Sequence, residues 1–322
     1  MLEIELTGTY FEIGQTYGRF IEKFLSSSSP NEETVECALE CEKAVKKYAS
    51  GLLEEIQGIT EVTDRPYEYL LAEYLIPHSM RECNVFVISG ELTKNKLPIF
   101  VRHMDWFERD LIYFHKLITH SNGGYRSLAF NFGDIGRCGG INECGLAIAE
   151  ASIPFYVHKA RPGIETTLAI RWILDNCSNA KEAAQYLEKI PHAQASAFLI
   201  GDKKGILFKG ECTPEKVDIT LFNDFAIVNT FFQSEQMKHL ENMPKTDRAY
   251  RFHWTIKNWI LKHKGTITTE SVKEVCKGHE NGICEHLEEG GTIWSWIAEL
   301  GTGVLDLAEG YPCKNNYKLF TL

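Results

Sequence analysis

Two apolar runs on either side of a polar turn limit how this chain can fold. The runs 83–88 and 97–106 have the length of strands, and the segment 91–96 between them is polar. This pattern predicts a β-hairpin. The start of one strand lies beside the end of the other in such a hairpin, so we expect Cys83, Arg102 and Asp105 to meet. A thiol, a guanidinium and a carboxylate together are the parts of a nucleophilic site.

The rest of the chain alternates between blocks of strands and groups of helices. Blocks of this kind, rather than a regular strand–helix alternation, predict an α+β fold with antiparallel sheets and helices packed outside. No Gly/Pro-rich linker long enough to separate domains is present. Strands are predicted over 2–6, 83–90, 97–104, 112–120, 125–130, 145–152, 196–202, 204–210, 215–222, 224–230, 292–300, 303–308 and 317–321, and helices over 10–24, 66–76, 165–176, 180–189, 247–263 and 269–277.

One further helix is expected to be long. Apolar residues recur at helical spacing from Val35 to Ile56, which predicts a single amphipathic helix. Its start carries Ser29 as a possible cap, Pro30 in the first turn and Glu32 to complete a capping box.

Composition excludes several classes of protein. The 322 residues carry a net charge of −10 without a Lys/Arg cluster, which argues against nucleic-acid binding. No apolar run approaches the length of a membrane span, and residues 1–25 lack the pattern of a signal peptide. The ten cysteines are therefore expected to be reduced thiols of a cytoplasmic protein.

Several motifs, in order along the chain, resemble those of a known family. They are Cys83 itself and the segments 8–14, 102–106, 140–147, 227–230, 247–251, 283–286, 292–295 and 310–313. Together they resemble the N-terminal-nucleophile hydrolases that cleave linear amides. This group contains the cholylglycine hydrolases, penicillin V acylase and the acyl-coenzyme A:6-aminopenicillanic acid acyltransferases, and the last branch is the most similar.

The resemblance implies a four-layer αββα sandwich that cuts itself between Glu82 and Cys83. Residues 1–82 would be a helical leader, released or retained as a small subunit, and 83–322 the catalytic part of one structural unit. The freed α-amine would act as the base for the Cys83 thiol, and an acyl-Cys83 thioester would pass to water or to an amine. The implied partners are a small acyl amide, acyl-coenzyme A or an amine acceptor, without a cofactor, nucleic acid or membrane. Some related enzymes are homo-oligomers.

The same resemblance implies roles for five further residues. Asp105 would hold the new ammonium group, and Arg102 would lower the pKa of the thiol. Asn229 would donate to the oxyanion, with Arg248 as electrostatic support. Ser152 stands where a second oxyanion residue is expected.

Two alternative functions remain at this stage. One is a Cys-His hydrolase without self-cleavage, and the other is a non-catalytic binding protein that retains the fold. The flanking residues Glu82, Asn84 and His103 differ from the usual pattern of the family. They bear on self-cleavage more than on the fold.

Aromatic residues near the hairpin suggest that the acyl group is apolar. They are Phe86, Trp106, Phe107, Tyr113 and Phe114.

A second cluster of reactive side chains raises the question of zinc. Cys276, His279, Cys284 and His286 lie within 11 residues. The spacing C-x2-H-x4-C-x-H is not common among structural zinc sites, so we expect no metal.

Overall fold

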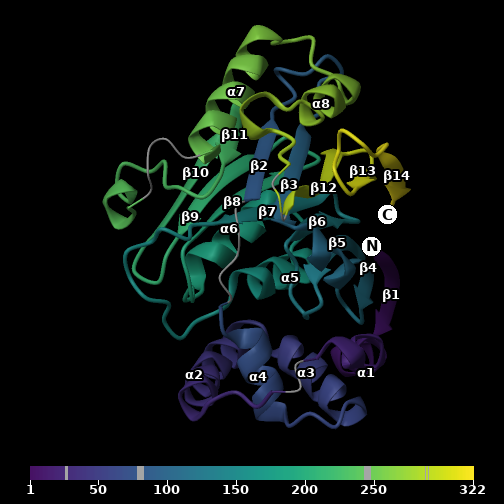
Figure 1. Ribbon diagram of the computed structural model, residues 1–322, viewed down its shortest axis with the longest axis vertical. Helices are drawn as coiled ribbons and strands as arrows, with labels where there is room; N and C mark the ends of the chain where they lie inside the picture. The colour runs from purple at the N-terminus through teal and green to yellow at the C-terminus, as the bar shows by residue number, and fades with distance from the viewer. Residues whose placement is uncertain (26–27, 78–82, 243–247, 287, 289) are drawn as a thin grey trace.

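Two sheets packed face to face form the centre of the molecule, and helices cover both outer faces (Figure 1). The computed structural model describes residues 1–25, 28–77, 83–242, 248–286, 288 and 290–322. Helices α5 and α6 contact the eight-stranded sheet, while α7 and α8 contact the six-stranded one. This layering confirms the predicted α+β class. A further group of helices, α1 to α4, lies beyond α5 and α6 (Figure 1).

The eight-stranded sheet has the order β1-β4-β5-β6-β7-β8-β9-β10, and the six-stranded sheet has the order β11-β2-β3-β12-β13-β14. The strands are β1 Leu2–Gly8, β2 Cys83–Ile88, β3 Ile99–Phe107, β4 Phe114–Ser121, β5 Ser127–Phe132, β6 Gly139–Asn142, β7 Leu146–Ser152, β8 Ser196–Asp202, β9 Leu207–Cys212, β10 Val217–Phe222, β11 Phe225–Val228, β12 Gly290–Glu299, β13 Val304–Glu309 and β14 Lys318–Thr321. The helices are α1 Tyr10–Ile21, α2 Glu32–Tyr48, α3 Ser50–Val62, α4 Tyr67–Leu75, α5 Thr166–Asn176, α6 Ala180–Lys189, α7 Arg248–Lys262 and α8 Thr269–Cys276.

The long N-terminal helix predicted from periodicity is two helices. The backbone leaves the helical region at Ala49, between α2 and α3, where Ser50 and Gly51 are weak helix formers. The predicted start is also displaced, because the oxygen of Asn31 accepts the N–H of Thr34 at 2.8 Å and caps α2 in place of Ser29. The short strand β6 was not predicted separately.

Strand alternation divides the core of the hairpin between two apolar layers. Cys83, Val85 and Met104 belong to the layer between the two sheets. Phe86 and Val101 belong to the layer between the six-stranded sheet and helices α7 and α8. Because successive side chains point to opposite faces, each strand of the hairpin presents one set of residues to each layer.

Residues 1–77 are firmly packed onto the rest of the molecule. Strand β1 pairs with β4, and this pairing is parallel where only antiparallel sheets were expected. Arg171 of α5 forms buried ion pairs with Glu55 of α3, at 3.3 Å, and with Asp175, at 2.7 Å. The hydroxyl of Tyr10 donates to Asp175 at 3.0 Å. The strand pairing, the Glu55–Arg171 ion pair and the Tyr10–Asp175 hydrogen bond cross between the expected leader and the catalytic part.

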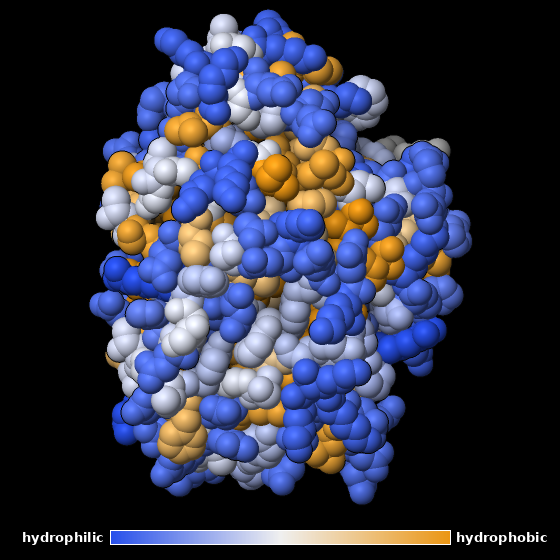
Figure 2. Space-filling view, turned by 180° about the vertical axis from the view of Figure 1, so that it is seen from behind, coloured by the Kyte–Doolittle hydropathy of each residue, from blue (hydrophilic) through white to orange (hydrophobic). Residues whose placement is uncertain are grey.

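The face seen in Figure 2 is largely hydrophilic, with hydrophobic residues in small groups between the polar ones. In the described part of the chain, no helix combines the length and apolar character that a membrane crossing requires.

Candidate active site

The β2–β3 hairpin brings Cys83 and Arg102 together as predicted from the sequence, whereas Asp105 lies at the same end of the hairpin with its carboxylate on the opposite face. Cys83 pairs with Met104 across the two antiparallel strands. Its Sγ lies 3.4 Å from Nη2 of Arg102 and 3.5 Å from Sδ of Met104, and the backbone N–H of Asp105 acts to lower the pKa of the thiol. Arg102 and this N–H therefore both favour a thiolate.

Arg102 is fully buried, and it has hydrogen-bond and ion-pair partners besides the thiol. Its Nη1 donates to the carbonyl oxygens of Cys138 and Glu150, each at 2.5 Å. Its Nη2 lies 3.1 Å from Oε1 of Glu150, in an ion pair that is buried on both sides. A buried cation needs such a partner, because an unpaired charge in the core is very costly. The guanidinium is thereby fixed beside the sulfur.

Burial dominates the acidity of the thiol in the uncut chain. It raises the pKa of Cys83 to about 12, and Glu150 acts in the same direction, while Arg102 acts to lower that pKa. Burial also raises the pKa of Glu150. The expected effect of Arg102 on the thiol therefore has the predicted sign, but desolvation outweighs it.

Asp105 directs its carboxylate to a polar network on the other face of the hairpin. Its Oδ2 accepts from Asn84 at 2.7 Å and from Arg248 at 2.9 Å, and its Oδ1 accepts from Thr292 at 2.6 Å. Arg248 also pairs with Glu285 at 2.7 Å. We call Asn84, Asp105, Arg248, Glu285 and Thr292 the outer network.

Asn229 joins this network through Asn84, the residue next to Cys83. It follows β11, which pairs with β2, and its amide nitrogen donates to the Oδ1 of Asn84. The atypical Asn84 therefore bridges Asn229 and Asp105. Asn229 is fully buried, and its own Oδ1 has no hydrogen-bond partner.

Of the remaining predicted site residues, one is hydrogen-bonded to a neighbour of Arg102 and the other lies outside the described residues. Ser152 donates to Oε2 of Glu150 at 3.3 Å, and none of the hydrogen bonds found among the described residues joins it to Cys83. Glu82, the predicted cleavage residue, lies outside the described residues.

His103 does not form a Cys-His pair with Cys83. It lies opposite Asn84 in the hairpin register and packs against Phe252 of α7, on the face away from the sulfur. Burial lowers its pKa to about 4, so its imidazole is uncharged and only weakly basic at neutral pH. Within the described ranges no hydrogen bond links any histidine to the Cys83 sulfur.

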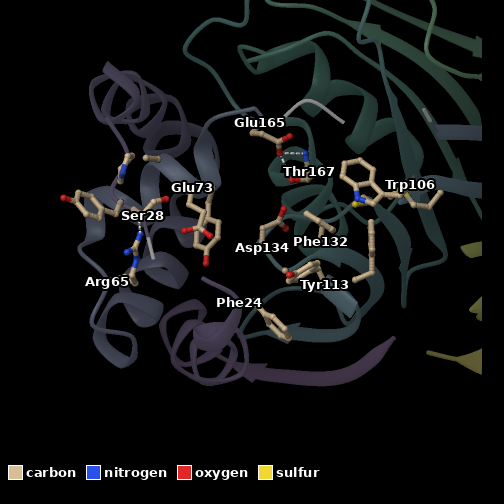
Figure 3. Close-up of a pocket in the computed structure, with 18 residues that line it drawn as sticks. Phe24, Ser28, Arg65, Glu73, Trp106, Tyr113, Phe132, Asp134, Glu165 and Thr167 are labelled. Carbon is tan, nitrogen blue, oxygen red and sulfur yellow. Dashed lines mark hydrogen bonds between the residues drawn. The ribbon is translucent and has the colours of Figure 1, made fainter. Parts of the chain in front are cut away.

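A cavity of about 570 Å³ opens near Cys83, which is itself buried and is not among the lining residues. Its lining includes Met104, whose sulfur touches that of Cys83, and Cys138, whose carbonyl binds Arg102. Figure 3 shows Trp106 and Phe132 on one side, Arg65 and Glu73 on the opposite side, and Phe24 at the lower edge. The last three come from the expected leader, so the two parts of the chain enclose this space together.

Three of the five aromatic residues singled out near the hairpin line this cavity. They are Trp106, Tyr113 and Phe114. Phe86 instead packs against Phe252, because strand alternation turns it toward α7. Phe107 is not among the lining residues.

Sequence reasoning missed two residues that complete the site. Glu150 is a single carboxylate within the otherwise apolar or small strand Leu146–Ser152, which is a readable sign of a buried charged partner. Thr292 gives no such sign, because its contact with Asp105 depends on how β12 lies beside β3.

Facing sheets between helical layers, with a buried thiol at the start of an inner strand, define the fold of the N-terminal-nucleophile hydrolases. Penicillin V acylase from Agrobacterium tumefaciens has this fold with a TM-score of 0.55 at 18% identity, over 74% of this chain and 86% of that one. A conjugated bile acid hydrolase from Clostridium perfringens gives 0.47 at 16% identity, over 74% and 97%. No curated protein sequence gave a match.

The chain belongs to the acyl-coenzyme A:6-aminopenicillanic acid acyl-transferase family, whose sequence model matches residues 92–314. The match includes Arg102, Asp105, Asn229 and Arg248, and it begins after Cys83. The protein is therefore an enzyme of the class that hydrolyses linear amides or transfers acyl groups.

Proposed function

We propose that this enzyme activates itself by cutting the Glu82–Cys83 bond and then cleaves linear amides through an acyl-Cys83 thioester. The observation that carries the proposal is the contact of the Cys83 sulfur with the buried Arg102 guanidinium, 3.4 Å away, and with Met104, which lines a cavity of ligand size. The thiol therefore has an electrostatic partner, and the cavity lined by Met104 would take the acyl group.

Self-cleavage would proceed by attack of the Cys83 sulfur on the carbonyl carbon of Glu82. The acyl group moves from nitrogen to sulfur, which frees the α-amine of Cys83, and water then hydrolyses the thioester to leave Glu82 as a carboxylate. The new amine has an unperturbed pKa of roughly 7.7–8.0. It is therefore a suitable base for the neighbouring thiol at neutral pH.

In the cut enzyme the amine would take the thiol proton while the sulfur attacks the substrate carbonyl, and would return that proton to the leaving amine. Asp105 would hold the amine in its ammonium form. The amide of Asn229 has a second N–H beyond the one given to Asn84, and this would donate to the oxyanion. Water or an amine acceptor would then release the acyl group from Cys83.

The cavity supports an apolar acyl group. Its wall beside Met104 consists largely of aromatic rings, which bind apolar groups through burial of surface and ring contacts. The family model and the penicillin V acylase neighbour suggest penicillin V, other N-acyl amides of graded chain length and acyl-coenzyme A with an amine acceptor as first substrates to test.

We further propose that residues 1–82 stay bound after the cut as a small subunit. The pairing of β1 with β4, the ion pair between Glu55 and Arg171 and the shared cavity wall support this. We also propose a reducing, cytoplasmic setting, in keeping with ten cysteines that are all free thiols.

The intact mass of the purified protein tests this proposal. Denatured protein should give two chains of 82 and 240 residues (322 − 82), and native mass spectrometry should show them as one particle. Incubation with a substrate amide should add one acyl group to the Cys83 chain. A mass that stays at full length, with no activity on any of these acyl compounds, would contradict the proposed mechanism.

A further inference from the structure

Four side chains with metal-binding atoms converge near the start of β12, in a region that the proposed reaction does not use. His279, Cys284, His286 and Cys313 each offer one ligand atom, and these atoms lie within 4.8 Å of one another. Nε2 of His286 lies 3.7 Å from Sγ of Cys284 and 3.1 Å from Sγ of Cys313. Two thiols and two imidazoles around one point are the donor set of a structural zinc site. We propose that these four residues bind one zinc ion.

The distances are close to those that a bound ion would impose. Zinc holds sulfur at about 2.3 Å and imidazole nitrogen at about 2.0–2.1 Å in a tetrahedron, which places its ligand atoms roughly 3.3–3.8 Å apart. The two separations at His286, 3.1 and 3.7 Å, lie at or near this range. Each thiol would release its proton to solvent as its sulfur binds, and the two thiolates would balance the charge of the ion.

The fold fixes two of these ligands, Cys284 and His286, before any metal binds. The N–H of Cys284 donates to the carbonyl of Gly278 at 2.7 Å, and His286 forms a β-bridge with Gly291. The ring of Tyr311 stacks on that of His286 at 4.1 Å, two residues before Cys313. A site whose ligands are held in advance loses less conformational entropy on binding.

The tertiary structure replaces one member of the cluster seen in the sequence. Cys276 is fully buried in the apolar layer beneath α7 and α8 and lies outside the four-residue group. Cys313, 27 residues beyond His286, takes its place. The irregular spacing that argued against zinc therefore came from counting the wrong cysteine.

The site also adjoins the outer network, a connection that rests on the proposed function. Glu285 lies between two of the ligands, Cys284 and His286, and pairs with Arg248, which in turn pairs with Asp105. Arg248 also donates to the carbonyl of Gly282 at 2.8 Å. A metal that fixes this segment would hold Arg248 in place, so Arg248 and Glu285 are positioning residues.

Metal content tests the site independently of catalysis. Protein purified under reducing conditions should contain about one zinc per chain. Replacement by cobalt should give the strong visible absorption of a tetrahedral, thiolate-bound ion. Cys284→Ser and Cys313→Ser should each weaken zinc binding by at least about 100-fold, the upper end of what the loss of an outer contact alone causes. His279→Gln, a substitution at an exposed ligand, provides a variant that should fold even if the cysteine variants do not.

Cys276→Ala is the matched control and should retain the metal. Loss of zinc from Cys276→Ala together with its retention by Cys313→Ser would overturn the proposed ligand set. The site itself would be overturned if the reduced wild-type chain bound no zinc after incubation and desalting. A Cys284–Cys313 disulfide in the protein isolated from cells would overturn it as well.

Discussion

The two faces of the β2–β3 hairpin differ in what they hold near the nucleophile. The face toward the other sheet carries the Cys83 thiol, with Arg102 and Glu150 as a closed, fully buried ion pair. The face toward α7 carries the outer network around Asp105, which extends to Glu285 beside the proposed zinc ligands. The reacting atom is thus separated from much of the charge that would support it.

This separation follows from the geometry of a strand. Neighbouring side chains point to opposite faces, so Cys83 and Asn84 belong to different environments although they are adjacent in sequence. The α-amine that cleavage would free belongs to the backbone, which both faces share. We therefore infer that the inner face governs the thiol and the outer face governs the new amine, and the following experiments test that division.

The largest effect is expected from Cys83→Ala, which removes the nucleophile of the inner face. Loss of a nucleophile removes most of an enzyme's acceleration, so self-cleavage should stop and turnover should fall at least about 10⁴-fold. Intact mass and amide hydrolysis measure the two effects. Cys138→Ala, which removes a buried thiol from the lining of the nearby cavity, is the matched control. If that variant lost activity and Cys83→Ala kept it, the nucleophile would be Cys138.

Glu150→Gln should lower the free energy of unfolding through its effect on the inner face. It leaves the Arg102 guanidinium buried without its counter-charge, which typically costs about 3–5 kcal/mol. Urea unfolding of the uncut form should show this loss. Since Glu150 raises the pKa of the Cys83 thiol, the same variant should also alkylate faster at Cys83. An unchanged free energy of unfolding would mean that the Arg102–Glu150 ion pair does not stabilise the fold.

Asp105→Asn should slow turnover through its effect on the outer network, because it removes a charge but hardly changes the size of the side chain. The neutral amide no longer balances Arg248 and would hold an ammonium group poorly, so we expect turnover to fall about 10²–10³-fold. Asp306→Asn is the control, because Asp306 forms a comparable ion pair with Lys273, at 3.0 Å, on β13 of the same sheet. That variant should lose stability but keep its rate per folded molecule, and an equal loss of rate in both would refute a specific role for Asp105.

Alkylation of Cys83 should depend on pH differently before and after the cut. Burial raises the thiol pKa to about 12 in the uncut chain, so the thiolate fraction and the labelling rate should rise about tenfold per pH unit from pH 7 to 9, without a plateau. In the cut chain the nearby ammonium group should lower this pKa and produce a plateau at lower pH.

One tryptic digest reports both forms. Cleavage after Arg81 gives a peptide beginning at Glu82 from the uncut chain, whereas the cut chain gives one beginning at Cys83. A plateau near neutral pH in the peptide that contains Glu82 would show that Arg102, rather than burial, sets the acidity of the thiol.

The smallest effect is expected from removal of the proposed zinc. Loosening the segment around Glu285 should weaken its pairing with Arg248 and slow turnover about 3- to 10-fold, as for the loss of one partly buried ion pair. Chelation followed by readdition of zinc measures this. The same treatment should change the turnover of Glu285→Gln little, because that variant already lacks the pairing with Arg248. If chelation slowed the wild-type enzyme and Glu285→Gln equally, the metal would not act on turnover through the outer network.

The sequence by itself determined the elements and the composition of the hairpin. The periodic spacing of apolar residues determined most strands and helices, because this spacing is a local property of the sequence. Antiparallel pairing of two such strands placed Cys83, Arg102 and Asp105 at one end of the hairpin. The break at Ala49 was not readable in this way, since helical periodicity continues across it and only the weak helix formers Ser50 and Gly51 mark it.

The tertiary structure alone decided which distant groups complete each face. Glu150, Thr292 and Cys313 reach their partners from separate strands or turns, and no sequence spacing encodes such contacts. The structure also decided that burial outweighs Arg102 at the thiol, because desolvation depends on everything packed around the sulfur. The adjacent residues Cys83 and Asn84 lie on opposite faces of the hairpin. On each face, residues far apart in the sequence come into contact, as Arg102 and Glu150 do on the inner face.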